Sequence, residues 1–78
     1  MIEINLQLYS ILREKLPPES KGRSVMQISE GTTLKDLLAA LGITRRVVIS
    51  VNDDQELDKS RSLNDGDDVK IFSSISGG

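Results

Sequence analysis

The chain ends in Gly77-Gly78, and a carboxylate carried on two glycines is a group with usable chemistry. Glycine has no Cβ, so such an end can pass through a narrow channel and adopt many backbone conformations. The residues from Ser73 onward, fully extended, span at most about 20 Å, which is enough to reach a pocket in another protein. The glycine pair alone leaves two interpretations open. Either the terminal carboxylate is the reactive group, or the pair is an inert chain end or an expression remnant.

The composition removes most other kinds of chemistry. The sequence contains no Cys and no His, which excludes a thiol nucleophile, a disulfide, a thiolate metal site and a Ser-His-Asp arrangement. The remaining glycines stand alone and form no phosphate-binding loop, and the acidic residues lack the spacing of a cation-binding loop. We therefore expect no catalysis by this chain on its own, no metal site and no permanently bound cofactor.

The charge balance argues against two classes of partner. Ten basic and twelve acidic side chains give a net charge of −2, and one Tyr and one Phe offer little for base stacking, so we expect no nucleic-acid partner. No apolar run approaches the length that spans a membrane, and no signal-peptide pattern opens the chain. We expect a soluble cytoplasmic protein of one small domain.

Seven carboxylates lie between Asp53 and Asp68 against only Lys59 and Arg61. The simplest interpretation is solvated loop and turn chemistry, because Asp favours turns. An acidic docking face is the alternative.

Alternation of apolar and polar residues predicts the strands. Ile2 to Leu8 gives the clearest example. A short helix follows over residues 11–16, with Ser10 as its N-cap and Pro17-Pro18 as its end. Gly22 marks a reversal in an exposed loop. Further strands are expected at residues 24–29, 47–52, around Leu57 and, after an Asp65-Gly66 turn, at 69–72.

One amphipathic helix is predicted between the second and third strands. Thr33 and Asp36 fit a capping box, and Gly42 fits the left-handed position that ends a helix. The leucines at i, i+3, i+4 and i+7 form one apolar face, and they are Leu34, Leu37, Leu38 and Leu41. This stripe needs the apolar face of a sheet, so the residues predict an α+β fold with the helix across one sheet face.

Three segments of the sequence resemble those of a known family. Tyr9-Ser10-Ile11-Leu12-Arg13-Glu14 is similar to an aromatic-Ala-x-Leu-Arg-Glu segment, and Leu63 to Val69 is similar to a Leu-x-Asp-Gly-Asp-x-Val turn. Phe72 to Gly78 is similar to a final Phe-Pro-Pro-Val-x-Gly-Gly. These segments are typical of the ubiquitin-like sulfur carriers of the MoaD/ThiS family, and especially of its MoaD branch, the small subunits of molybdopterin synthase. The resemblance covers essentially the whole chain.

The resemblance implies a β-grasp (ubiquitin-like) fold, with a mixed sheet of four or five strands and one main helix on one face. Residues 1–72 would form the domain, and residues 73–78 a flexible tail. It also implies that a ubiquitin-activating-type adenylyltransferase uses ATP to convert the Gly78 carboxylate to an acyl-adenylate, which sulfur transfer turns into a thiocarboxylate. The large subunit of molybdopterin synthase would then receive the tail and use that sulfur.

The same resemblance assigns roles to the residues before Gly78. Ile75, Ser76 and Gly77 would enter the partner, with Ile75 at the apolar position of the tail. Ser73-Ser74 departs from the two prolines of the family, so the tail would lose more conformational entropy on docking. Phe72 lies on the strand face opposite Val69 and Ile71 and is either an exposed partner contact or the cover of a secondary apolar cluster.

Three alternatives to the molybdopterin pathway stay open. The chain could deliver sulfur to another pathway, such as thiazole or cysteine formation. It could be a ubiquitin-like modifier that forms isopeptides through Gly78. It could also be a plain interaction domain whose glycines have no chemical role.

Overall fold

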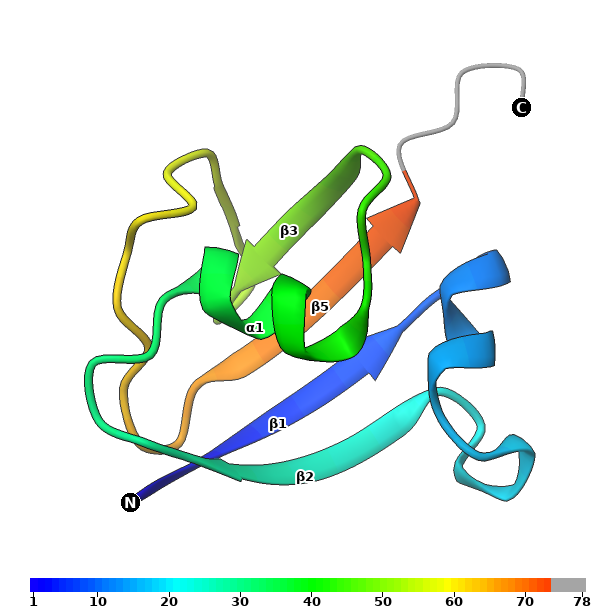
Figure 1. Ribbon diagram of the computed structural model, residues 1–78, viewed down its shortest axis with the longest axis horizontal. Coiled ribbons are helices and arrows are strands. Elements are labelled where there is room, and N and C mark those ends of the chain that lie inside the picture. The colour runs from blue at the N-terminus through cyan, green and yellow to red at the C-terminus, as the bar shows by residue number, and fades with distance from the viewer. Residues whose placement is uncertain (74–78) are drawn as a thin grey trace.

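A computed structural model describes residues 1–73 as one mixed sheet of five strands with an α-helix across one of its faces (Figure 1). The order in the sheet is β2-β1-β5-β3-β4. The strands and the helix are β1 (Ile2–Leu8), β2 (Arg23–Ile28), α1 (Leu34–Leu41), β3 (Val47–Val51), β4 (Asp54–Glu56) and β5 (Asp68–Ser73). The predicted α+β architecture is confirmed.

Strand β5 is last in the sequence and central in the sheet. It pairs in parallel with β1 and antiparallel with β3, as Figure 1 shows. Its register places Ile71 beside Leu8 on one side and Ile49 on the other. A parallel pair needs a long crossover, and here the connection contains all the elements between β1 and β5. The strand that leads into the C-terminal residues is therefore held along both edges.

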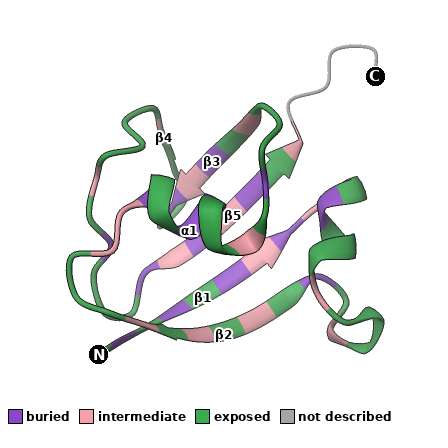
Figure 2. Cartoon of the chain, viewed as in Figure 1, coloured by how far each residue is buried: buried purple, intermediate pink, exposed green. Residues whose placement is uncertain are grey.

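The core lies between the sheet and α1. Alternate residues of β1 are buried, from Ile2 to Leu8, and Val69 and Ile71 of β5 are fully buried (Figure 2). Three of the four predicted helix leucines are buried, whereas Leu41 only packs against the edge of this cluster. Each fully buried Val, Leu or Ile stabilises the fold by about 1.5–3 kcal/mol before conformational entropy is counted. The alternation in the sequence is thus the pattern that builds the core.

The ends of α1 agree with the prediction. The Asp36 N–H donates to Thr33 Oγ1 at 3.1 Å, and the Thr33 N–H donates to Asp36 Oδ2 at 3.1 Å, so the capping box is complete. At the other end Gly42 has φ 72°, in the left-handed region. The two caps satisfy backbone groups that a helix of eight residues would otherwise leave unpaired.

The first helical segment differs from its prediction. It is a 3₁₀ helix, η1 (Ser10–Lys15), followed by a 3₁₀ turn, η2 (Pro18–Ser20). The prediction that Ser10 is the N-cap is wrong: Tyr9 holds that position, without a side-chain hydrogen bond, and Ser10 has φ 53°. The reason is that the Tyr9 N–H still donates to the Ile71 carbonyl at 3.2 Å. The backbone therefore follows β5 through Tyr9 and turns only at Ser10.

The predicted strand around Leu57 is displaced. Strand β4 ends at Glu56, and Leu57 is 83% exposed. The strand follows a two-residue turn in which Asn52 and Asp53 have φ 53° and 71°. Two residues of positive φ make the turn that matches the twist of a hairpin, and Asn and Asp tolerate that conformation. The turn chemistry, rather than an apolar pattern, sets the position of β4. Strand β2 is also shifted, by one residue, and runs from Arg23.

The acidic stretch is not uniformly solvated as predicted. Asp67 is only 5% exposed, and its carboxylate accepts hydrogen bonds from Asn52 Nδ2 at 3.0 Å and from the Asn64 N–H at 2.8 Å. Asn52 Oδ1 in turn accepts from the Asp68 N–H at 2.9 Å. This network joins the β3–β4 turn to the start of β5. The prediction was wrong for Asp67 because a burial that depends on a partner 15 residues away has no local pattern.

Candidate functional site

The described residue nearest the C-terminus is Ser73, at the end of β5. It pairs with Val47, and the preceding Phe72 pairs with Val48. The predicted site residues Ile75, Ser76, Gly77 and Gly78 lie outside the described residues and stay predictions. Among the predicted site residues, Phe72 is the one that lies within the described part of the chain.

The ring of Phe72 stacks on the ring of Tyr9. Their centroids are 4.3 Å apart, and the ring planes differ by 13°. Phe72 is 36% exposed and Tyr9 is partly buried, so the pair presents an aromatic surface where β5 ends. Aromatic pairs of this kind contribute about 0.5–1.5 kcal/mol beyond their area burial. Both predicted roles of Phe72 are geometrically compatible with this arrangement: it covers Tyr9, and it keeps an exposed face for a partner.

Sequence reasoning missed the position of Tyr9. The signal for it is the parallel register of β1 and β5, in which Leu8 lies beside Ile71. The next residues along the two strands are then neighbours on the opposite face of the sheet. The register could not be read from the alternation of either strand alone.

The face of the sheet opposite α1 is open and mixed in character. Its polar residues come from β1 and β5 and include Glu3, Asn5, Gln7, Asp68 and Lys70. Three exposed apolar side chains interrupt them, namely Val25 on β2, Val48 on β3 and Phe72 on β5. Val48 and Phe72 are directly paired, so with Tyr9 they form an apolar patch where β5 ends, which we call the aromatic patch.

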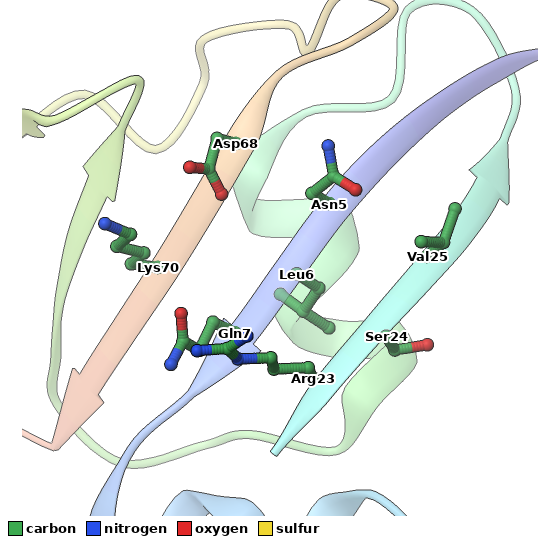
Figure 3. Close-up of a pocket in the computed structure, with 8 residues that line it drawn as sticks. All are labelled: Asn5, Leu6, Gln7, Arg23, Ser24, Val25, Asp68 and Lys70. Atoms are coloured by element: carbon green, nitrogen blue, oxygen red, sulfur yellow. The ribbon is translucent and has the colours of Figure 1, made fainter. Parts of the chain in front are cut away.

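A shallow hollow of about 550 Å³ lies on this open face, between the start of β5 and β2 (Figure 3). Lys70 lines it and forms an ion pair with Asp53, with Nζ and Oδ1 3.3 Å apart. The hydrogen bond from Lys70 to Asp53 raises the pKa of Lys70 above its ordinary value, and the negative charge of Asp53 acts in the same direction. Lys70 is therefore charged at neutral pH, and the hollow is polar along the β5 side.

Other kinds of site have no support among residues 1–73. In this part of the chain no three carboxylates gather in the way that a metal ion requires. None of its helices has the length and apolar character to cross a membrane. The feature that distinguishes this end of the described domain is the aromatic patch.

Comparison with known proteins decides the family. The sequence profile of the ThiS family matches residues 6–78. The chain belongs to the ThiS family. The predicted membership of the MoaD/ThiS group is confirmed, and the match includes the terminal residues Gly77 and Gly78. No curated protein sequence matches the chain.

Solved structures with the same fold include two proteins connected with molybdopterin. A Pyrococcus furiosus protein described as molybdopterin converting factor subunit 1 superposes with a TM-score of 0.75 at 16% identity, over 96% of this chain and all of that one. Subunit 1 in a complex of subunits 1 and 2 of the Helicobacter pylori molybdopterin-converting factor gives 0.65 at 17% identity, over 99% of this chain and all of that one. Small archaeal modifier protein 1 of Haloferax volcanii superposes with a TM-score of 0.74 at 14% identity, over 96% of this chain and all of that one.

These likenesses confirm the ubiquitin-like β-grasp fold for this ThiS family member. At identities below 20% they concern the fold alone. A converting-factor subunit and a protein modifier share it about equally well, so the shape of the domain does not choose between sulfur delivery and protein modification.

Proposed function

We propose that this ThiS family protein is a sulfur carrier whose Gly78 carboxylate is adenylated, then thiocarboxylated, and then delivers sulfur in molybdopterin synthesis. The observation that carries the proposal is the family match, which continues through the tail to Gly78. A match confined to the β-grasp domain would support a binding module equally well. We expect the protein to act in the cytoplasm as a carrier and not as an enzyme on its own.

The chemistry requires a second protein. In the first step an oxygen of the Gly78 carboxylate attacks the α-phosphorus of ATP, pyrophosphate leaves, and an acyl-adenylate forms. In the second step a persulfide sulfur on the donor protein attacks the acyl carbon, AMP leaves, and an acyl disulfide forms. A thiol of the donor then reduces that disulfide, which frees the terminus as a thiocarboxylate and leaves a disulfide on the donor. The chain has no Cys or His to catalyse either step, so a ubiquitin-activating-type adenylyltransferase must supply the catalytic groups.

The architecture suits such a carrier. Because β5 is hydrogen-bonded to β1 and β3, its end, which precedes the terminal residues in the sequence, is a fixed point of the domain. The aromatic patch lies beside that point, and aromatic residues are enriched among the anchors of protein interfaces. A partner that receives Gly78 would thus contact Phe72 as well, as predicted from the sequence.

The molybdopterin pathway is favoured by the Leu12-Arg13-Glu14 segment. Leu12 is 2% exposed and fixes η1 against the core, so the segment that resembles the MoaD branch is an integral part of this domain. In the similar Helicobacter pylori structure, subunit 1 is bound to subunit 2. We propose the corresponding large subunit as the partner here.

Two other functions remain alternatives to sulfur delivery in molybdopterin synthesis. The family itself is compatible with sulfur delivery to thiazole or cysteine formation. The likeness to small archaeal modifier protein 1 supports isopeptide formation through Gly78 as the second candidate function.

Deletion of Gly77-Gly78 in the host distinguishes these pathways. If the proposal is right, the deletion abolishes molybdoenzyme activity, and growth without thiamine or cysteine is unchanged. A requirement for thiamine or cysteine would move the protein to another sulfur pathway, and loss of covalent conjugates alone would make it a modifier. Normal molybdoenzyme activity in the deletion strain would contradict the proposal.

A further inference from the structure

A second hollow, of about 460 Å³, lies where β1 ends, against η1, η2 and the start of β2. We call it the basic hollow. Its side chains with hydrogen-bonding groups are three cations and three hydroxyls in addition to Gln7, and no carboxylate lines it. The cations and hydroxyls are Arg13, Lys21, Arg23, Tyr9, Ser10 and Ser20.

None of the three cations forms an ion pair with a carboxylate among residues 1–73. The ion pairs in this part of the chain join Arg61 to Glu56 and Lys70 to Asp53, and neither includes a residue of the basic hollow. A cluster of three unpaired cations stands out on a chain with a net charge of −2. Such a cluster attracts anionic groups and accelerates their association.

The backbone places Arg13 over Gly22. A Cβ at Gly22 would lie 2.9 Å from Arg13 Cγ and 2.5 Å from the Leu8 carbonyl oxygen, so only glycine leaves room for this contact. Gly22 has φ 81° and accepts a hydrogen bond from the Leu8 N–H at 2.7 Å. The stem of Arg13 therefore rests on a fixed surface, and the guanidinium loses less entropy when it binds an anion.

Lys21 and Arg23 flank the same glycine. Lys21 has φ 56°, a left-handed conformation that ends η2, and Ser20 Oγ accepts from the Gly22 N–H at 3.3 Å and donates to the Pro17 carbonyl at 2.7 Å. Arg23 pairs with Gln7 in the β1–β2 ladder, and both also line the open-face hollow, as Figure 3 shows. Residues distant in sequence are thus brought to one site by turn geometry.

The basic hollow adjoins the aromatic patch at the end of β5. Tyr9 lines the hollow and also stacks on Phe72. We propose that the basic hollow binds an acidic segment, with neighbouring Asp or Glu side chains, on the protein that receives the C-terminus. The identity of that protein rests on the proposed function. The recognition of an acidic peptide by the basic hollow is independent of the proposed function.

A segment with several carboxylates fits the hollow better than a small free oxyanion does. The three cations are all exposed, and an exposed ion pair contributes only about 0–1 kcal/mol because water and salt screen it. Several such pairs made at once, with Arg binding carboxylate through two parallel hydrogen bonds, give a usable affinity and a defined orientation. The hydroxyls of Tyr9 and Ser10 can each donate a further hydrogen bond to a carboxylate, whereas the Ser20 hydroxyl already donates to the Pro17 carbonyl.

The test is an NMR titration of the full-length ¹⁵N-labelled chain with a synthetic acetyl-Glu-Asp-Glu-Asp-Gly-amide peptide. We expect shifts at the amides of Ser10, Arg13, Lys21 and Arg23, weaker binding as NaCl rises from about 20 to about 200 mM, and no shifts with the Gln-Asn-Gln-Asn peptide. The variant R13Q/K21Q/R23Q should bind about tenfold more weakly. The control K35Q/R46Q/K59Q removes the same charge elsewhere on the surface and should bind within about twofold of the wild type.

Three results would overturn the proposal. The triple variant could bind the peptide as the wild type does, or inorganic phosphate at equal concentration could shift the same amides equally. The same amides could also shift with protein concentration alone, which would make a second copy of the chain the occupant. If the triple variant is unfolded, as a loss of dispersion in its NMR spectrum would show, the titration is repeated with the single variant K21Q, which should also bind the peptide more weakly than the wild type. Repeating the titration on the chain without Gly77-Gly78 separates this proposal from sulfur transfer, because the peptide result should not change.

Discussion

Phe72 and Tyr9 are neighbours across the parallel β1–β5 pair, with ring centroids 4.3 Å apart and planes 13° from parallel. One residue belongs to the strand that leads to the tail, and the other lines the basic hollow. The contact therefore connects the two surfaces proposed for partner binding. It is also the part of the site that can be perturbed without touching the core.

Replacing Phe72 with Ala tests the aromatic patch. We expect a loss of about 1–2 kcal/mol in the free energy of unfolding, because the stacked pair and part of the ring's burial disappear. Affinity for the large synthase subunit should fall at least about tenfold, measured by calorimetry, since aromatic anchors dominate interface energies.

The matched control for this variant is Val25→Ala. Val25 is 60% exposed on the same face of the sheet, beside Asn5 rather than beside the end of β5. Its removal should leave both stability and affinity nearly unchanged. Equal effects of the two substitutions on affinity would argue that Phe72 only covers Tyr9.

Replacing Asp67 with Asn tests the buried carboxylate. Both carboxylate oxygens accept hydrogen bonds, from Asn52 and from the Asn64 backbone, and an amide offers only one acceptor. The substitution places an amide NH₂ against one of these donors at a position that is only 5% exposed, and we expect a cost of about 1–3 kcal/mol in chemical denaturation. Asp58→Asn, at an exposed position, should cost much less, and comparable losses would show that the Asp67 network is not a special stabilising feature.

Alanine substitutions at Gly22 and Gly31 distinguish the cost of a steric clash from the cost of a left-handed backbone conformation. Their φ values are 81° and 85°, but a Cβ at Gly31 meets nothing within 4 Å, whereas one at Gly22 meets the Leu8 carbonyl at 2.5 Å. Gly31→Ala should therefore cost only about 1–2 kcal/mol for the left-handed conformation. Gly22→Ala should cost clearly more and should displace the Arg13 side chain, which melting curves and the Arg13 Nε resonance would detect.

Strand β5 and the β3–β4 turn are also linked through the ion pair of Lys70 with Asp53. The pKa of Lys70 is raised, chiefly by its hydrogen bond to Asp53, so the pair stabilises the fold fully below the unfolded pKa of about 10.4. This contribution is lost as the pH rises through the higher folded value. Asp53→Asn should lower the Lys70 midpoint followed by ¹³Cε NMR, and an unchanged midpoint would mean that Asp53 does not cause the shift.

The sequence predicted the parts of the fold that depend on local repetition. The alternation from Ile2 to Leu8, the leucine stripe of α1 and the Thr33–Asp36 capping box appear in the structure as expected. Each is specified by residues within one or two turns of each other, so composition and spacing are sufficient to predict it.

The predictions that were wrong concern features that depend on contacts between segments distant in the sequence. Ser10 fails as an N-cap because the Tyr9 backbone is bound to Ile71, and Asp67 is buried because Asn52 lies opposite it. Strand β4 has no apolar alternation and follows only from the left-handed turn at Asn52. For the same reason the sequence indicated Phe72 but not its stack on Tyr9, and it gave no sign that Arg13, Lys21 and Arg23 share one hollow.

The most direct test of the central claim is the intact mass of the protein purified from its own host under mild, non-reducing conditions. A fraction of the chains should carry the mass increase expected when sulfur replaces one oxygen, and fragmentation should place that change on Gly78. The increase should vanish when the adenylyltransferase gene is deleted. A chain of unmodified mass in actively growing cells, with or without that gene, would contradict the account.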